Sequence, residues 1–148
     1  MTTLRRAACL VVLCLAAGSA PAFAGVKQDA LVAEVNSARH AHGLGSLAAS
    51  PSLNRSASGL AGQLMQDNWF GHAGAIDAGG GFRALGEALS LHSGKRPRYG
   101  ATVQGWLASP PHRALVLSTA FARVGAGMAR GPFNGRPSTI WVLHLGAY

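Results

Sequence analysis

Residues 105–117, "GWLASPPHRALVL", place a histidine directly after two prolines. Proline has no backbone N–H to donate and disfavours helical geometry in the residue before it. Pro110 and Pro111 therefore predict a rigid corner between an amphipathic helix and a second apolar run. His112 follows this corner immediately. Such a histidine belongs either to a functional site or merely to a turn, and the rest of the chain must decide between the two.

The first residues have the features of a secretory signal peptide. Arg5 and Arg6 precede an apolar run, and Ala22-Phe23-Ala24 supplies the small residues that a signal peptidase reads. A membrane anchor is the competing interpretation, but the run is shorter than the roughly 20 residues that span hydrocarbon. We predict a signal peptide at residues 1–24, cleaved near Ala24, and a secreted or periplasmic domain at residues 25–148.

The predicted mature domain is basic and free of cysteine. Cys9 and Cys14 both lie in the predicted signal peptide. Eleven Lys and Arg and five acidic residues remain after residue 24, a net charge of +6. This balance favours anionic partners such as an anionic lipid or a cell-wall component. Nucleic acid is not expected as a partner, because the chain is predicted to be exported and carries no recognised nucleic-acid-binding motif. The protein is expected to be a monomer.

Periodicity divides the mature chain into a helical half, a glycine-rich middle and a strand-rich tail. Apolar spacing predicts helices at 26–42, 51–68 and 99–108, with Ser50 as the cap of the second. Residues 70–81 contain five glycines and are predicted to be a loop. Two antiparallel strands are predicted at 122–128 and 139–145, with an Asn134-Gly135 turn signal between them. Helices against a small antiparallel sheet make a layered α+β domain.

Five stretches occur in the order and spacing of a known family. They are "VNSARHAHGLGSL" (35–47), "WFGH" (69–72), "ALGEAL" (84–89), "WLASPPHRALVLSTAFARVGAGM" (106–128) and "IWVLHLG" (140–146). Together they resemble the CAP superfamily, or SCP domain, of cysteine-rich secretory, antigen 5 and pathogenesis-related 1 proteins. The likeness is greatest to the cysteine-free bacterial members and covers about Val26 to Tyr148. It implies an α–β–α sandwich with a central cleft.

The same resemblance suggests a site. In that family two histidines and two glutamates converge in the cleft, and in some members they hold a divalent metal. The matching positions here are His72, Glu87 and His112, while the second glutamate has no counterpart, since no acidic residue lies between Glu87 and His112. Two imidazoles and one carboxylate can still form a catalytic-type zinc site with water as the fourth ligand. A divalent metal such as zinc is therefore a candidate cofactor, although the missing carboxylate weakens the case for metal binding.

A purely structural interpretation competes for each of these residues. Glu87 can be a partly buried carboxylate that accepts hydrogen bonds from a neighbouring loop, and His72 can pack beside Trp69 and Phe70. Four further residues match or flank family positions and are expected to support the cleft: Asn36 and Arg39, which brace loops by hydrogen bonding, and Trp106 and Ser109. Four other histidines are not expected to belong to the site. His40 and His42 lie two residues apart on a predicted helix, so their side chains point to different faces. His92 is expected to be a solvated loop residue, and His144 a paired, half-buried imidazole on the last strand.

Two classes of function follow. The first is a non-enzymatic secreted module whose cleft, with basic and aromatic surroundings, binds a lipid, a wall fragment or another ligand at the cell envelope or outside the cell. The second is a hydrolase that uses Glu87 as general base, a metal-activated water, or a Ser109–His112 pair. The chain lacks the Gly-x-Ser-x-Gly and His-Glu-x-x-His motifs. The sequence therefore favours the binding module.

Overall fold

The computed structural model describes residues 23–148 of the chain. Two helices make up most of the first part of this range. Helices α1 (Phe23–Ala41) and α2 (Pro51–Gln66) confirm the helices predicted there. Ser50 caps α2 from an extended backbone, and its hydroxyl accepts a hydrogen bond from the amide of Leu53 at 3.4 Å. The predicted signal peptide lies outside the described residues except for its last two, which begin α1, so its cleavage stays a prediction.

Four strands form one sheet, and their order in the sheet differs from their order in the sequence. Its strands are β1 (Ala48–Ala49), β2 (Ala84–Ser93), β3 (Arg123–Phe133) and β4 (Arg136–Ala147), arranged as β1-β3-β4-β2. β3 and β4 confirm the predicted antiparallel pair, and their turn residues Asn134 and Gly135 both have positive φ, as a tight hairpin requires. β2 adds a third antiparallel strand and β1 a short parallel one, so the sheet is mixed.

Two helices separate β2 from β3. These are α3 (Tyr99–Ala108), as predicted, and α4 (Pro110–Val116). Ser109 between them is extended, with ψ 116°, which confirms the predicted corner. Both prolines occupy the first turn of α4, where backbone N–H groups have no partner within the helix, so the missing N–H of proline costs no hydrogen bond. The apolar run after the corner is therefore a helix, which its sequence alone did not predict.

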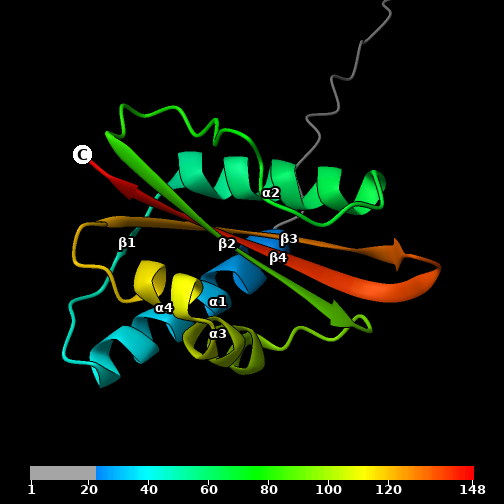
Figure 1. Ribbon diagram of the computed structural model, residues 1–148, viewed down its shortest axis with the longest axis horizontal. Coiled ribbons are helices and arrows are strands. Elements are labelled where there is room, and N and C mark those ends of the chain that lie inside the picture. The colour runs from blue at the N-terminus through cyan, green and yellow to red at the C-terminus, as the bar shows by residue number, and fades with distance from the viewer. Residues whose placement is uncertain (1–22) are drawn as a thin grey trace, which may run out of the picture.

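Helices cover both faces of the sheet. In Figure 1, α2 lies on one side of the strands, and α1, α3 and α4 lie on the other. Strand residues alternate between two cores. The core beneath α2 is built from Ala57, Ala61, Leu64, Leu89, Ile140 and Val142. The opposite core is built from Leu31, Val35, Ala88, Val103, Trp106, Trp141, Leu143 and Leu145. This arrangement confirms the predicted α–β–α sandwich of the α+β class.

Helix α2 lies unusually close to strand β3. A Cβ atom added to Gly127 would be 2.1 Å from the backbone carbon of Ala57, and one added to Gly125 would be 2.3 Å from the backbone of Leu53. Side chains at these two positions would therefore push the helix off the sheet. The two glycines therefore allow α2 to pack closely on the sheet, over β3 and β4. Within residues 23–148, no helix combines the length and the apolar character that crossing a membrane requires.

Candidate functional site

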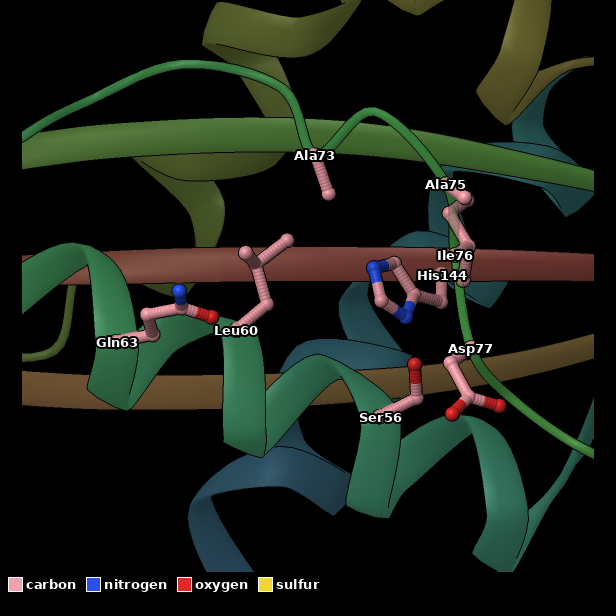
Figure 2. A pocket seen from close by; sticks show the side chains of 8 residues that line it. All are labelled: Ser56, Leu60, Gln63, Ala73, Ala75, Ile76, Asp77 and His144. Atoms are coloured by element: carbon pink, nitrogen blue, oxygen red, sulfur yellow. The ribbon is translucent and has the colours of Figure 1, made fainter.

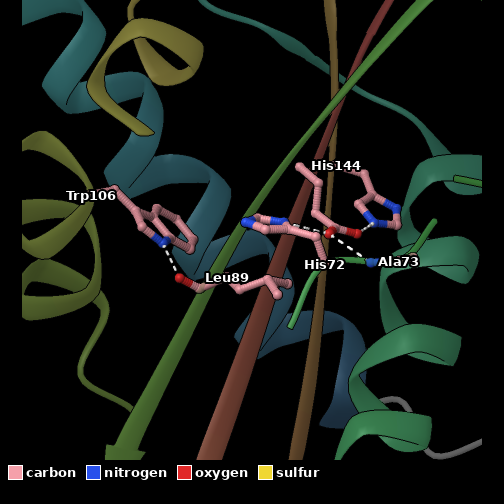
Figure 3. A network of polar contacts seen from close by, with 6 residues as sticks. His72, Ala73, Leu89, Trp106 and His144 are labelled. Atoms are coloured by element: carbon pink, nitrogen blue, oxygen red, sulfur yellow. Dashed lines mark hydrogen bonds and ion pairs between the residues drawn. The ribbon is translucent and has the colours of Figure 1, made fainter. Parts of the chain in front are cut away.

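Glu87 on β2 is the centre of a buried polar network. Its direct cross-strand partner is His144 on β4, and because Leu89 and Val142 face α2, both side chains lie on the α2 side of the sheet. One carboxylate oxygen of Glu87 accepts a hydrogen bond from Nε2 of His144 at 3.0 Å. The other accepts one from Nδ1 of His72 at 2.8 Å and one from the amide of Ala73 at 3.3 Å. Figure 3 shows the two imidazoles approaching this point from different elements.

The environment of Glu87 acts on its pKa in two opposite directions. Burial raises the pKa, because it removes water from the charged form. Hydrogen bonds from His144 and His72, together with the charges of the two imidazoles, lower it. The lowering contributions outweigh burial, and the net pKa lies below the ordinary value of 4.5. Glu87 is therefore a carboxylate at neutral pH, and both of its oxygens are already engaged.

The charge on Glu87 fixes which ring nitrogen of each partner carries a hydrogen. An ionised carboxylate only accepts hydrogen bonds, so Nδ1 of His72 and Nε2 of His144 must each carry a hydrogen. In the neutral imidazoles the opposite nitrogens, Nε2 of His72 and Nδ1 of His144, then bear lone pairs. The side chain of His72 is 60% exposed, so its lone pair is open to a ligand, whereas His144 is 1% exposed.

His112 lies near His72 but outside the hydrogen-bonded network. It sits in the first turn of α4, half-buried, and its ring centroid is 6.2 Å from that of His72. Burial lowers the pKa of His112, and the charge of His72 lowers it further. The structure thus brings His72 and Glu87 into contact and places His112 beside His72, without a hydrogen bond between His112 and Glu87 in the described part of the chain. The shared ligand-binding role of the three residues stays a prediction.

Two of the four supporting residues, Asn36 and Arg39, hold segments that follow the helices. Asn36 exchanges two hydrogen bonds with the backbone of Leu47. Arg39 is 4% exposed and donates to three carbonyl oxygens, those of Gly45, Val116 and Ser118. Both therefore brace loops, as the sequence suggested.

The other two supporting residues differ in what they contact. The indole N–H of Trp106 donates to the carbonyl of Leu89 at 2.9 Å and so ties α3 to β2 two residues from Glu87 (Figure 3). Ser109 precedes α4 but makes no side-chain capping hydrogen bond. No hydrogen bond joins Ser109 to His112 among residues 23–148. The geometry gives no support to a Ser–His nucleophile pair.

Sequence reasoning missed His144 and misplaced His92. His144 is paired, as expected, but it is fully buried rather than half-buried, and because its partner is Glu87 it belongs to the network from which it had been excluded. The signal that could have found it is its alternation with Val142 on a strand, which puts both on one face. His92 lies on β2, not in a solvated loop; it is half-buried and bonded to Ser90 and Thr102. Burial lowers its pKa, and the charge of Arg98 lowers it further.

Three cavities surround the loop from Trp69 to Asp77. The α4-side cleft, of about 440 Å³, is lined by His72, Ala73, Gly74, Ala75, Ile76, Leu85, Gly86, Glu87 and Leu115. The aromatic cavity, of about 260 Å³, is lined by Leu60, Gln63, Leu64, Asp67, Trp69, His72, Ala73 and Gly74. The α2-side pocket, of about 190 Å³, is lined by Ser56, Leu60, Gln63, Ala73, Ala75, Ile76, Asp77 and His144. Trp69, which lines the aromatic cavity, is 54% exposed, and its neighbour in sequence, Phe70, is 39% exposed.

The charge of these cavities is opposite to that of the whole chain. Asp67, Asp77 and Glu87, three of the five acidic residues, line them. None of the lining residues is Lys or Arg. One aromatic residue, Trp69, lines the aromatic cavity, and the lining of the three cavities contains none of the basic residues expected around the cleft. Net charge describes the whole surface and does not say where the charges lie.

The residues of the site fit a metal only in part. His72 and His112 offer two imidazoles, but the Glu87 carboxylate is 6% exposed and already accepts three hydrogen bonds, which leaves little of it for a cation. Residues 23–148 contain no group of three or more His, Cys, Asp or Glu side chains that could hold a metal ion. A three-ligand zinc site needs such a group. The described residues therefore do not support a chemical step through a metal, and zinc binding stays a prediction.

The α–β–α sandwich, with His72 and Glu87 in contact beside an open cleft, has the arrangement that the resemblance to SCP-domain proteins implies. The model of the cysteine-rich secretory protein family, CAP, matches residues 32–145. The chain belongs to this family. A comparison with curated proteins finds no significant match.

Solved structures of similar proteins support the same fold. An outer surface protein of Borrelia burgdorferi is 22% identical with a TM-score of 0.63, over 80% of this chain and 90% of that one. An extracellular SCP-domain protein of Bacillus anthracis is 20% identical with a TM-score of 0.67, over 84% of this chain but only 41% of that longer one. Venom allergen-like protein 4 of Schistosoma mansoni is 13% identical with a TM-score of 0.64, over 82% and 88%.

Proposed function

We propose that this CAP-domain protein is a non-enzymatic binding module that acts at the cell envelope or outside the cell. Its N-terminal sequence has the features of a secretory signal peptide. Two similar structures carry names that place those proteins on an outer surface or outside the cell. The ligand would be a component of the envelope, a lipid or a wall fragment, bound in the cavities around residues 69–77.

One observation carries this proposal: an exposed histidine is held in place between two open cavities beside exposed aromatic rings. His72 lines both the α4-side cleft and the aromatic cavity, and Trp69 lines the latter. The hydrogen bond from Nδ1 of His72 to Glu87 fixes the ring and leaves Nε2 free to contact a ligand. An indole face beside a fixed polar group suits the flat, partly apolar surface of a sugar ring or an acyl chain.

The state of Glu87 favours binding over hydrolysis. A general base works best with a pKa near the working pH and needs a free oxygen directed at the substrate. The pKa of Glu87 is lowered instead, and both oxygens accept hydrogen bonds from histidines. The carboxylate therefore positions the imidazoles rather than acting on a substrate.

A separate basic surface supports attachment to an anionic envelope. Lys95, Arg96 and Arg98 are exposed in the segment between β2 and α3. Positive side chains near a surface of anionic lipids or wall polymers are attracted to it, and the attraction weakens with salt. We assign the anionic partner to this basic segment and the ligand to the acidic cavities.

Trp69 provides the test of ligand binding. The other two tryptophans, Trp106 and Trp141, are buried, so quenching or a shift of the exposed-tryptophan emission reports on Trp69. Envelope lipids and purified wall fragments are titrated into the purified protein. We expect saturable change with at least one class, absent from W69F and weakened in H72A. A full panel without saturable change, or the same change in W69F, contradicts binding at this site.

Attachment to the envelope is tested apart from ligand binding. Co-sedimentation with phosphatidylglycerol vesicles should exceed that with phosphatidylcholine vesicles and should fall at high salt. Replacing Lys95, Arg96 and Arg98 by alanine should abolish the difference, while W69F should leave it unchanged. Equal binding to both vesicles, or binding that salt does not weaken, contradicts the electrostatic attachment.

A further inference from the structure

The α2-side pocket contains a feature that the proposed function does not use. Its floor is β4, and its walls are α2 and the loop segment Ala73–Asp77 (Figure 2). Ser56 and Gln63 project from α2, Asp77 from the loop, and His144 from the strand. Figure 2 shows a ring nitrogen of His144 turned toward Ser56 and Asp77. Polar groups from three separate elements thus meet around one small space.

His144 has an unpartnered nitrogen in this pocket. Nδ1 is buried and has no hydrogen-bond partner among the described residues, although His144 as a whole is 1% exposed. Buried polar atoms in folded proteins are nearly always hydrogen-bonded, because an unpaired one has lost its interaction with water and gained nothing. An occupant of the pocket that His144 lines can supply the missing partner of this nitrogen.

The hydrogen bond on the other side of the ring defines what this ligand must offer. Nε2 of His144 donates to the Glu87 carboxylate, so in the neutral ring Nδ1 is a hydrogen-bond acceptor. The Asp77 carboxylate also only accepts, and the Ser56 hydroxyl and Gln63 amide can accept. None of the residues that line the pocket is Lys or Arg. The pocket therefore presents acceptors and negative charge to its occupant.

We propose that the α2-side pocket binds a small protonated primary amine. An ammonium group carries three N–H donors and a positive charge, so it can donate to Nδ1 of His144 and pair with Asp77 at once. Leu60 and Ile76 supply apolar walls for the carbon chain beside it. This inference rests on the proposed function, since it names the ligand chemistry of one part of the same cleft.

The size of the pocket limits what can enter. Its volume of about 190 Å³ holds roughly six waters at about 30 Å³ each. The space fits a free amine of a few heavy atoms, or the amine end of a larger molecule such as a lipid head group. Both sources share the same recognition chemistry, and the experiment separates them.

Calorimetry with ethanolammonium chloride tests the proposal. We expect saturable binding to the purified protein, with no binding of ethylene glycol, which lacks the charge, or of acetate, which carries the opposite charge. D77N should weaken binding about tenfold, the loss expected for one partly solvated charge pair. D67N is the matched control, because Asp67 is also an exposed acidic residue but lines the aromatic cavity instead. It should leave the affinity unchanged.

A second measurement reports on His144 without changing it. The ¹⁵N resonance of Nδ1 should move on addition of ethanolammonium, because a free lone pair becomes a hydrogen-bond acceptor, while that of Nε2 stays in place. Vesicles containing phosphatidylethanolamine, compared with phosphatidylcholine vesicles, show whether a lipid head group reaches the pocket. Stronger binding to the phosphatidylethanolamine vesicles that D77N abolishes identifies a lipid head group as the ligand. Binding of free ethanolammonium without this difference between the vesicles identifies a soluble amine.

Two results overturn the proposal: no saturable binding of the amine in either form, or binding that D77N and D67N weaken equally. These outcomes differ from failure of the proposed function. If the Trp69 titration finds an envelope ligand while ethanolammonium does not bind, only the amine pocket is wrong. If neither experiment shows binding, the cleft is not a binding site.

Discussion

Arg39 shows how a single buried side chain can join segments that are distant in sequence. From α1, it reaches the loop before β1 at Gly45 and the end of α4 at Val116 and Ser118. Burial lowers its pKa, but a guanidinium remains charged at any pH where the protein folds. The charge is compensated by three carbonyl oxygens. Removing it takes the donor from all three oxygens, of which that of Val116 is in a buried hydrogen bond.

We predict a large loss of stability for R39A. The free energy of unfolding should fall by about 3 kcal/mol, because a buried charged donor to three acceptors is lost. R39K should lose about half as much, since an ammonium keeps the charge but lacks the planar fork. R55A is the control: Arg55 is exposed on α2, and the change should stay within about 0.5 kcal/mol. Urea unfolding measures all three, and an R39A loss no larger than that of R55A would contradict the role.

The sequence predicted some residue roles better than others. Asn36 and Arg39 were expected to brace loops, and they do. Glu87 was interpreted as a carboxylate that accepts hydrogen bonds from a neighbouring loop, and it does accept them from His72 and Ala73. His144 was missed because its contact with Glu87 depends on the register between β2 and β4. Register follows from the pairing of segments 57 residues apart, which spacing along the chain does not reveal.

At the scale of elements, strand β2 is the instructive case. Its sequence "ALGEALSLHS" contains Ala, Leu, Gly and Glu, none of them a preferred strand residue. It becomes a strand because β4 offers a complete hydrogen-bonding edge and Trp106 anchors the carbonyl of Leu89. Tertiary contacts therefore override local preference here. The hairpin of β3 and β4 was predictable, because its turn signal and alternation are local.

The packing of α2 on β3 leads to a prediction about glycines. G127A should destabilise the protein by about 3 kcal/mol, because the added carbon meets the backbone of Ala57, which cannot rotate away. G62A, on the exposed side of the same helix, meets nothing within 4 Å and should stabilise by about 1 kcal/mol through helix propensity. Denaturant unfolding of the two variants measures both effects. Equal effects would mean that α2 does not rest on β3 as described.

At the scale of the whole molecule, charge is separated by location. The chain is basic, yet the cavities are lined by three of its five acidic residues and by no Lys or Arg. Composition gives the total and cannot give this division, because the acidic residues come together only when α2, β2 and the intervening loop pack. A protein arranged in this way can be held at an anionic surface by one face and accept a cationic group in another.

The same arrangement makes stability depend on pH in a defined direction. Burial favours the neutral forms of His92 and His112 and lowers their pKa values, so the unfolded chain binds protons first as the pH falls below 6.5. The pKa of Glu87 is also lowered in the fold, so its stabilising effect is complete above the ordinary value of 4.5 and is lost as the pH falls through the folded value. Stability should therefore decline in two steps on acidification.

E87Q separates the two steps. An amide accepts less strongly than a carboxylate and presents an N–H group to one of the two imidazoles, so the variant should be less stable than the wild type at about pH 7.5. Because the amide does not titrate, the difference should narrow as the pH falls below 4.5, where the wild type loses its own carboxylate. H92Q, which removes one of the histidines, should reduce the decline just below pH 6.5 and leave the lower step intact. Urea unfolding over this pH range measures each curve. A difference between E87Q and the wild type that stays constant from neutral to acid pH would show that the Glu87 network stabilises the fold without its charge.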